Sequence, residues 1–188
     1  FVTGGFYKRN ISGWQGGFVF DYLHDDWYTT IDLAQLRGEL SWGAGNGSSV
    51  GFMFATSVAE DNTTAVLGGA STDESWETHD LMAFFYEVQS NQHRRGTWRM
   101  FVGFTGESDG LVGSTMKIPL AGTWSLEPEF TYLVPDEETG FGGHDQESWN
   151  VAFNLVWYPG RARRGLELGR RTMLDVAGNG TMIPRLIP

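Results

Sequence analysis

Period-2 alternation of apolar and polar side chains runs through eight successive segments between Trp14 and Tyr158. In one of them Met82, Phe84 and Tyr86 alternate with Ala83 and Glu87. Such alternation predicts strands with one apolar and one polar face, because successive side chains of a strand point to opposite sides. No helical periodicity competes with it before residue 160. The sequence therefore predicts an all-β fold.

Charges are sorted between alternate connections of these segments. The first, third, fifth and seventh connections hold more than half of the 23 acidic residues and none of the 13 Lys and Arg residues. The second, fourth and sixth are shorter, and their only charges are Arg94 and Arg95. In an up-and-down barrel the odd and even connections lie at opposite ends. We therefore expect an acidic long-loop end and a basic short-turn end.

The expected fold is an eight-stranded antiparallel up-and-down β-barrel of the transmembrane type, with an extended C-terminal tail. We divide the chain into an N-terminal extension (1–12), the barrel (13–160) and a basic C-terminal arm (161–188). Residues 60–79 and 135–148 are expected to be long acidic loops. Pro119 is expected to mark a strand end or an irregularity, because proline cannot donate to a strand ladder.

The two faces of the strands differ in a way that favours lipid on the outside. One face carries most of the large aromatic side chains, and the other is rich in Gly, Ala, Ser and Thr with scattered charges. An eight-stranded interior is only wide enough for side chains to fill it, so this aromatic load would overpack it. The alternative is a soluble barrel or sandwich whose apolar face points inward. A stretch of about 18 apolar residues, which a transmembrane helix needs, is absent.

The polar face supplies a set of ionisable residues that we name the lumen charge network. Buried charges must be paired and hydrogen-bonded, so the expected role is a set of ion pairs that fills the barrel. A polar path for small ions is the alternative, and the narrow bore disfavours it. The network consists of Asp21, Arg37, Glu39, Glu87, Arg99, Lys117, Glu127 and Glu129.

Tryptophans fall near the ends of the expected strands. Amphipathic rings at both ends are what two interfacial girdles of a membrane barrel require. The alternative is that tryptophan simply marks strand ends in a core. The expected aromatic girdle comprises Trp14, Trp42, Trp98, Trp124, Trp149 and Trp157.

A weak metal site can be drawn at the acidic end, where three His-Asp dipeptides could converge. Imidazole and carboxylate groups could hold a divalent transition metal, and the acidic loop after residue 135 could hold a hard cation such as calcium. Solvated polar loops explain the same residues equally well, and no resident cofactor is expected. The candidate ligands are His24, Asp25, His79, Asp80, Asp136, His144 and Asp145.

Composition and motifs narrow the function further. The formal net charge of -10 disfavours nucleic acid as a partner, and the lack of cysteine excludes disulfides and thiolate metal sites. No nucleophile elbow, P-loop, dinucleotide fingerprint or zinc-protease motif is present, so no catalytic residue is assigned and an enzyme is not expected.

Three stretches, residues 32–42, 147–160 and 175–181, resemble planctomycete outer-membrane β-barrel-like proteins of unknown function, the second of them their final-strand motif. The resemblance implies an exported envelope barrel with no known catalytic residues. Outer-membrane barrels end on an aromatic residue of the last strand, whereas here a tail follows Tyr158. That tail could pair with a neighbouring copy or thread back toward the lumen.

The expected function is therefore a non-enzymatic bacterial outer-membrane barrel with a structural, envelope or surface-display role, in contact with membrane lipid. The alternative is a secreted soluble barrel subunit that binds a ligand or self-assembles through its tail. In either case, residues 161–188 are the candidate surface for a homo-oligomer.

Overall fold

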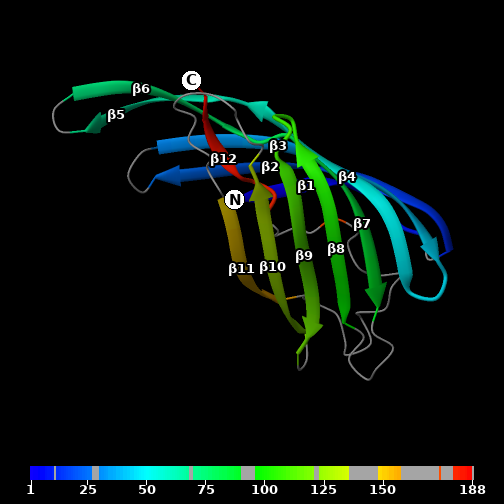
Figure 1. Cartoon of the computed structure of the whole chain (residues 1–188). Helices are drawn as coiled ribbons and strands as arrows, with labels where there is room; N and C mark the ends of the chain where they lie inside the picture. Colours follow the sequence, from blue (N-terminus) through cyan, green and yellow to red (C-terminus); the bar gives the residue numbers. More distant parts are fainter. Residues whose placement is uncertain are drawn as a thin grey trace.

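Two antiparallel sheets account for the strands of the computed structural model (Figure 1). The structure describes residues 1–10, 12–26, 30–67, 70–89, 96–120, 123–135, 148–157, 174 and 180–187. The strands are β1 (Val2–Lys8), β2 (Ser12–Asp26), β3 (Thr30–Ala44), β4 (Ser48–Ala59), β5 (Asp61–Leu67), β6 (Ala70–Thr78), β7 (Leu81–Gln89), β8 (Thr97–Thr105), β9 (Gly110–Pro119), β10 (Trp124–Val134), β11 (Ser148–Trp157) and β12 (Pro184–Ile187). The described residues contain no helix long and apolar enough to cross a bilayer.

The larger sheet has nine strands in the order β1-β2-β3-β4-β7-β8-β9-β10-β11 and is curled into a half-barrel (Figure 1). Alternation along the strands sets its two faces. In β7, Leu81, Ala83 and Phe85 are buried while Met82 and Phe84 are exposed. The all-β prediction and the antiparallel order of the eight alternating segments are confirmed, and β9 ends at Pro119 as expected.

The prediction of a closed eight-stranded barrel is wrong. A ninth strand, β1, forms within the residues assigned to the N-terminal extension, and β1 and β11 are not paired with each other. β1 pairs with β2 along its whole length, from Val2 opposite Tyr22 to Lys8 opposite Gly16. Its two glycines, Gly4 and Gly5, interrupt the alternation, so the strand is stabilised by its partner edge more than by its own pattern.

A second, three-stranded sheet of order β12-β6-β5 lies within the expected loop of residues 60–79 and the expected tail. The β5–β6 hairpin extends beyond the larger sheet (Figure 1). β5 contains the strand formers Thr63, Thr64 and Val66, and Gly68-Gly69 follows it in the sequence, which is a common hairpin signal. Because acidic side chains surround this stretch, the sequence predicts a solvated loop there instead of a hairpin.

An apolar core fills the concave side of the curled sheet near the long-loop end. It joins Ala55, Leu81, Ala83, Phe85, Phe101, Leu111 and Leu133 of the large sheet to Ile183 of the tail. A side chain at Gly113 would clash with the Phe101 ring, so glycine there leaves room for that ring in the core. The tail thus contributes to the interior through the buried residues Leu174, Met182 and Ile183.

Candidate functional site

Asp21 is the centre of the first cluster on the concave face. Its carboxylate is completely buried and accepts hydrogen bonds from Arg37 Nε at 2.5 Å and Nη2 at 3.0 Å. Thr3 Oγ1 of β1 and Gln35 Nε2 of β3 also donate to it, at 2.6 and 3.3 Å. Every partner stands at an inward position of strands β1 to β3. The buried charge is therefore both paired and hydrogen-bonded, as burial requires.

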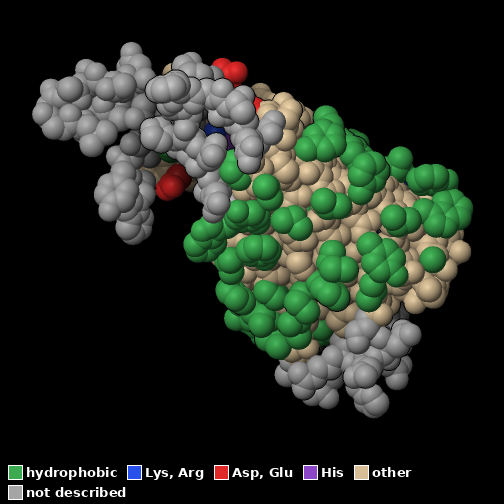
Figure 2. Space-filling model, in the orientation of Figure 1, with side chains coloured by type: hydrophobic (Ala, Val, Ile, Leu, Met, Phe, Trp, Pro, Cys, Tyr) green, Lys and Arg blue, Asp and Glu red, His purple; other side chains and the backbone are tan. Residues whose placement is uncertain are grey.

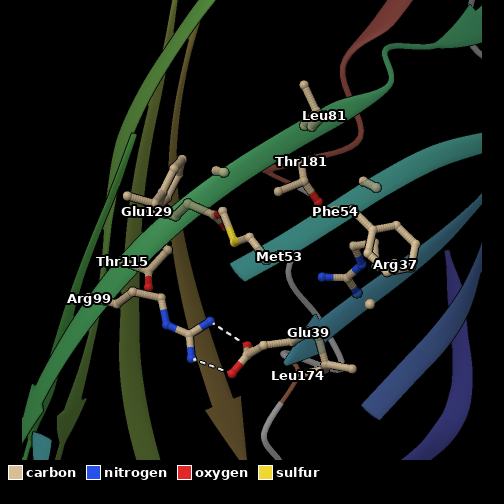
Figure 3. Close-up of a pocket in the computed structure, with 14 residues that line it drawn as sticks. Arg37, Glu39, Met53, Phe54, Leu81, Arg99, Thr115, Glu129, Leu174 and Thr181 are labelled. Carbon is tan, nitrogen blue, oxygen red and sulfur yellow. Dashed lines mark hydrogen bonds and ion pairs between the residues drawn. The ribbon is translucent and has the colours of Figure 1, made fainter. Parts of the chain in front are cut away.

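Arg99 of β8 is the centre of the second cluster (Figure 3). Its Nη1 donates to Glu39 Oε2 of β3 at 2.7 Å, and its Nη2 donates to Glu87 Oε2 of β7 at 2.9 Å. The guanidinium also lies 4.0 Å from the ring centroid of Phe85, a cation–π contact. Since β3 and β8 are not neighbours in the sheet, Arg99 ties one wall of the curl to another across its concave side.

The other three members of the lumen charge network share the inner face. Lys117 acts on the Glu87 carboxylate through its charge. Glu129 lies against Gly180 of the tail, where any side chain would clash with its carboxylate. Glu127 and Glu129 alternate along β10 and are both half-buried. The structure thus places all eight predicted residues on one polar, inward-facing surface, and the contacts above join five of them into two clusters.

A cavity of about 50 Å³ remains between these groups. It is lined by charged side chains of β3, β8 and β10, by Thr115, and by Leu174 and Thr181 of the tail (Figure 3). A space of this size holds about one or two water molecules. Apolar side chains such as Leu81 and Phe101 complete the lining, so the cavity lies where the ion pairs meet the apolar core.

The convex face has the opposite chemistry. Large apolar side chains stand exposed on every strand of the nine-stranded sheet, including Phe18, Phe84, Val102 and Phe153, the last with 73% of its surface exposed. Figure 2 shows hydrophobic side chains scattered over the side of the sheet that faces the viewer, and charged ones come into view there only near the β5–β6 hairpin. Polarity is thus inverted relative to a water-soluble barrel.

All six tryptophans of the expected girdle are exposed on this face. Trp14 and Trp42 pack edge to face with ring centroids 5.4 Å apart, and Trp124 and Trp157 lie 6.4 Å apart. Trp98 Nε1 donates to Ser114 Oγ at 2.7 Å. Five of the six, all but Trp149, lie at the short-turn ends of their strands.

The candidate metal ligands lie apart where the structure describes them. His24 Nδ1 pairs with Asp32 at 2.8 Å, and His79 Nδ1 pairs with Glu107 at 3.4 Å. Asp80 instead accepts a hydrogen bond from the backbone N–H of Ser57. Among the described residues no three His, Asp or Glu side chains gather as a metal site. Asp136, His144 and Asp145 lie outside the described residues.

The tail forms a feature that we name the C-terminal strap, residues 180–187. β12 pairs with β6, and the backbone N–H of His79 donates to the Ile183 carbonyl at 3.0 Å. Arg185 pairs with Glu77 and Glu107. The strap therefore corresponds to the second alternative for the tail, a return toward the lumen. Assembly between copies through residues 161–188 stays a prediction.

His79 is half-buried beneath the strap. Burial, and then the charge of Arg185, lower the pKa of its imidazole from the ordinary 6.5. Asp109, Glu77 and Asp80 act in the opposite direction and favour the protonated ring, but burial and Arg185 outweigh them, so the pKa is lowered.

Sequence reasoning missed several residues of the polar interior. Arg9 is not among the eight predicted network residues, yet its side chain is only 9% exposed and lies 3.9 Å from Glu87. No pattern marks it, because it lies in the connection from β1 to β2. Phe85 and Phe101 were not predicted as interior residues either. Each lies two positions from Glu87 or Arg99 on the same strand and therefore points inward with it.

Comparison with known proteins gives one family match. No curated protein matches the chain, and no solved structure does. The model of a family of unknown function, DUF6666, matches residues 1–184. Because the match spans nearly the whole chain, this protein belongs to the DUF6666 family.

Proposed function

We propose that this protein is a non-enzymatic outer-membrane protein of the bacterial envelope, with a structural or surface-display role. Its curled sheet would lie in the bilayer with the convex face toward lipid. The observation that carries the proposal is the inverted polarity of the sheet, in which ion pairs occupy the concave side and exposed aromatics the convex side. The resemblance of three stretches to planctomycete outer-membrane β-barrel-like proteins supports the same location.

The extent of the convex face supports lipid as its partner. Soluble monomers rarely expose contiguous apolar patches beyond a few hundred Å². Here exposed large apolar side chains occur on all nine strands, so water would be in contact with a mostly apolar sheet face. Contact with lipid hydrocarbon removes the free-energy cost of exposing this face to water, since lipid tails are as apolar as the side chains.

The ends of the sheet fit the same placement. The exposed tryptophans at the short-turn end match an interfacial girdle, where an amphipathic ring reaches both lipid and water. The acidic connections would then be displayed on the far side. An interior filled by ion pairs and the strap, with a cavity of about 50 Å³, suits a structural role better than transport or catalysis.

Extraction and flotation test the proposal. We expect the purified chain to require detergent, to float with phosphatidylethanolamine–phosphatidylglycerol vesicles, and to migrate faster on gels when unheated. A monodisperse particle in plain buffer that stays below the vesicles in a density gradient would contradict it. That result would favour the secreted soluble subunit.

A further inference from the structure

Among the described residues, no strand pairs with the outer side of β1 or of β11, the two edges of the nine-stranded sheet. We take the sheet to lie in a membrane, as proposed above, and rest the inference on that location. An open sheet edge does not persist in the hydrocarbon of a bilayer, because its backbone N–H and C=O groups would have no hydrogen-bond partners there. Both edges also bear strongly exposed apolar side chains, among them Phe6 (76%) and Trp149 (68%). Some strand must therefore cover each edge.

The curvature of the sheet indicates whether the covering strand belongs to the same chain or to a second copy. A closed cylinder of nine strands tilted by ~40° has a radius of roughly 9 Å, and one of eighteen strands about twice that. Arg99 on β8 binds Glu39 on β3, and Arg37 on β3 and Glu129 on β10 line the same cavity of about 50 Å³. Strands five places apart share a cavity this small only on the narrower cylinder. The strands from β3 to β10 therefore already curve as on a nine-stranded ring, and among the described strands only the two edges remain open.

The filled interior gives the same answer. A ring built from two copies would need a wide lumen between two facing concave sides, whereas Phe85, Phe101 and Ile183 already pack together inside one copy. Inward positions at the edges continue the polar lining: Thr3 of β1 bonds to Asp21, and Asn150 and Asn154 of β11 are half-buried.

We infer that β1 and β11 of the same chain pair with each other in the membrane and close a nine-stranded barrel. Strand direction alternates across an antiparallel sheet, so the first and ninth strands run the same way. The closing ladder is therefore parallel, as in the odd-stranded mitochondrial barrel. Both strands run from the long-loop end to the short-turn end.

Cysteine cross-linking tests the closure, since the natural chain has no cysteine. Gly4→Cys points outward from β1, where a side chain meets nothing within 4 Å. It is combined in turn with Val151→Cys, Phe153→Cys and Leu155→Cys on the outward face of β11. Each protein is oxidised in phosphatidylethanolamine–phosphatidylglycerol vesicles and run on non-reducing gels. We expect at least one pair to give an intrachain disulfide, seen as a faster monomer band that reduction abolishes.

Two further pairs calibrate the result. Phe6→Cys with Phe18→Cys joins register partners of β1 and β2 and must cross-link in any folded preparation. Gly4→Cys with Val102→Cys, on the exposed face of β8, must not. A disulfide-linked dimer from the β1–β11 pairs would overturn self-closure in favour of a two-copy ring. Absence of any cross-link, while the Phe6–Phe18 pair forms, would overturn closure altogether.

Failure of this inference is distinguishable from failure of the proposed function. A chain that floats with vesicles but leaves its seam unlinked retains the membrane role and loses the closure. A chain that forms the intrachain disulfide in buffer and does not float retains the closure and loses the membrane role.

Discussion

Arg99 shows how a single side chain organises the polar interior. It binds Glu39 and Glu87 and covers the Phe85 ring, so it links three inward positions contributed by β3 and β7. Glu39 is 5% exposed. A carboxylate that deep is tolerated only with a partner, because burial of an uncompensated charge is costly.

We expect Arg99→Met to destabilise the fold by about 3–5 kcal/mol, because Glu39 and Glu87 would be left buried without their main cation. Adding Glu39→Gln to that variant should recover part of the loss, since one uncompensated charge is removed. Urea unfolding in detergent micelles gives the free energies. Lys8→Met, an exposed charge on β1, is the control and should change stability by less than about 0.5 kcal/mol. Equal effects for Arg99→Met and Lys8→Met would contradict the buried network.

At the scale of elements, the C-terminal strap is held by β12 pairing, by Ile183 in the apolar core and by Arg185 at the surface. His79 lies beneath it and near Arg185. Protonation of this imidazole would place two positive charges side by side in a half-buried site. Docking of the strap therefore favours the neutral ring over the imidazolium.

The strap should loosen as pH falls. The folded pKa of His79 is lower than its ordinary value of 6.5, so the unfolded or undocked chain takes up the proton first. The stabilisation is complete above pH 6.5 and declines as pH falls from there toward the lowered folded pKa. Hydrogen exchange at residues 182–187 should accelerate over that window, and His79→Gln should abolish the dependence. His24→Gln, at a half-exposed site, is the matched control; loss of the pH effect in that variant instead would refute the assignment.

At the scale of the whole molecule, the decisive property is the orientation of the two faces. Exposed aromatics on the convex side and ion pairs on the concave side make water a poor solvent for this sheet. The same property predicts how a new charge should behave at different heights of the sheet.

Phe84→Arg places a charge in the middle of β7 on the convex face, where Phe84 is 62% exposed. In a bilayer we expect a loss of about 2–4 kcal/mol in the free energy of folding into vesicles. Leu120→Arg, just beyond the end of β9, should cost about 0–1 kcal/mol because it lies near the interface. Folding titrations in thin-bilayer vesicles measure both. If Phe84→Arg is neutral or improves solubility, the convex face meets water.

Alternation and charge parity by themselves determined the strands β2, β3, β4 and β7 to β11, their antiparallel order and the shared face of Asp21, Arg37, Glu39, Glu87 and Arg99. These follow from the sequence because side-chain direction in a strand has a period of two and is a local property. The tertiary structure alone decided that β1 adds a ninth strand, that Arg99 reaches Glu39 across the curl, that Arg9 is buried, and that the tail returns to the core. β1 pairs with the next strand along the chain, but its own residues carry no alternation that marks it as a strand. The other three contacts join residues far apart in the chain, and their meeting depends on the curvature of the whole sheet, which no local pattern encodes.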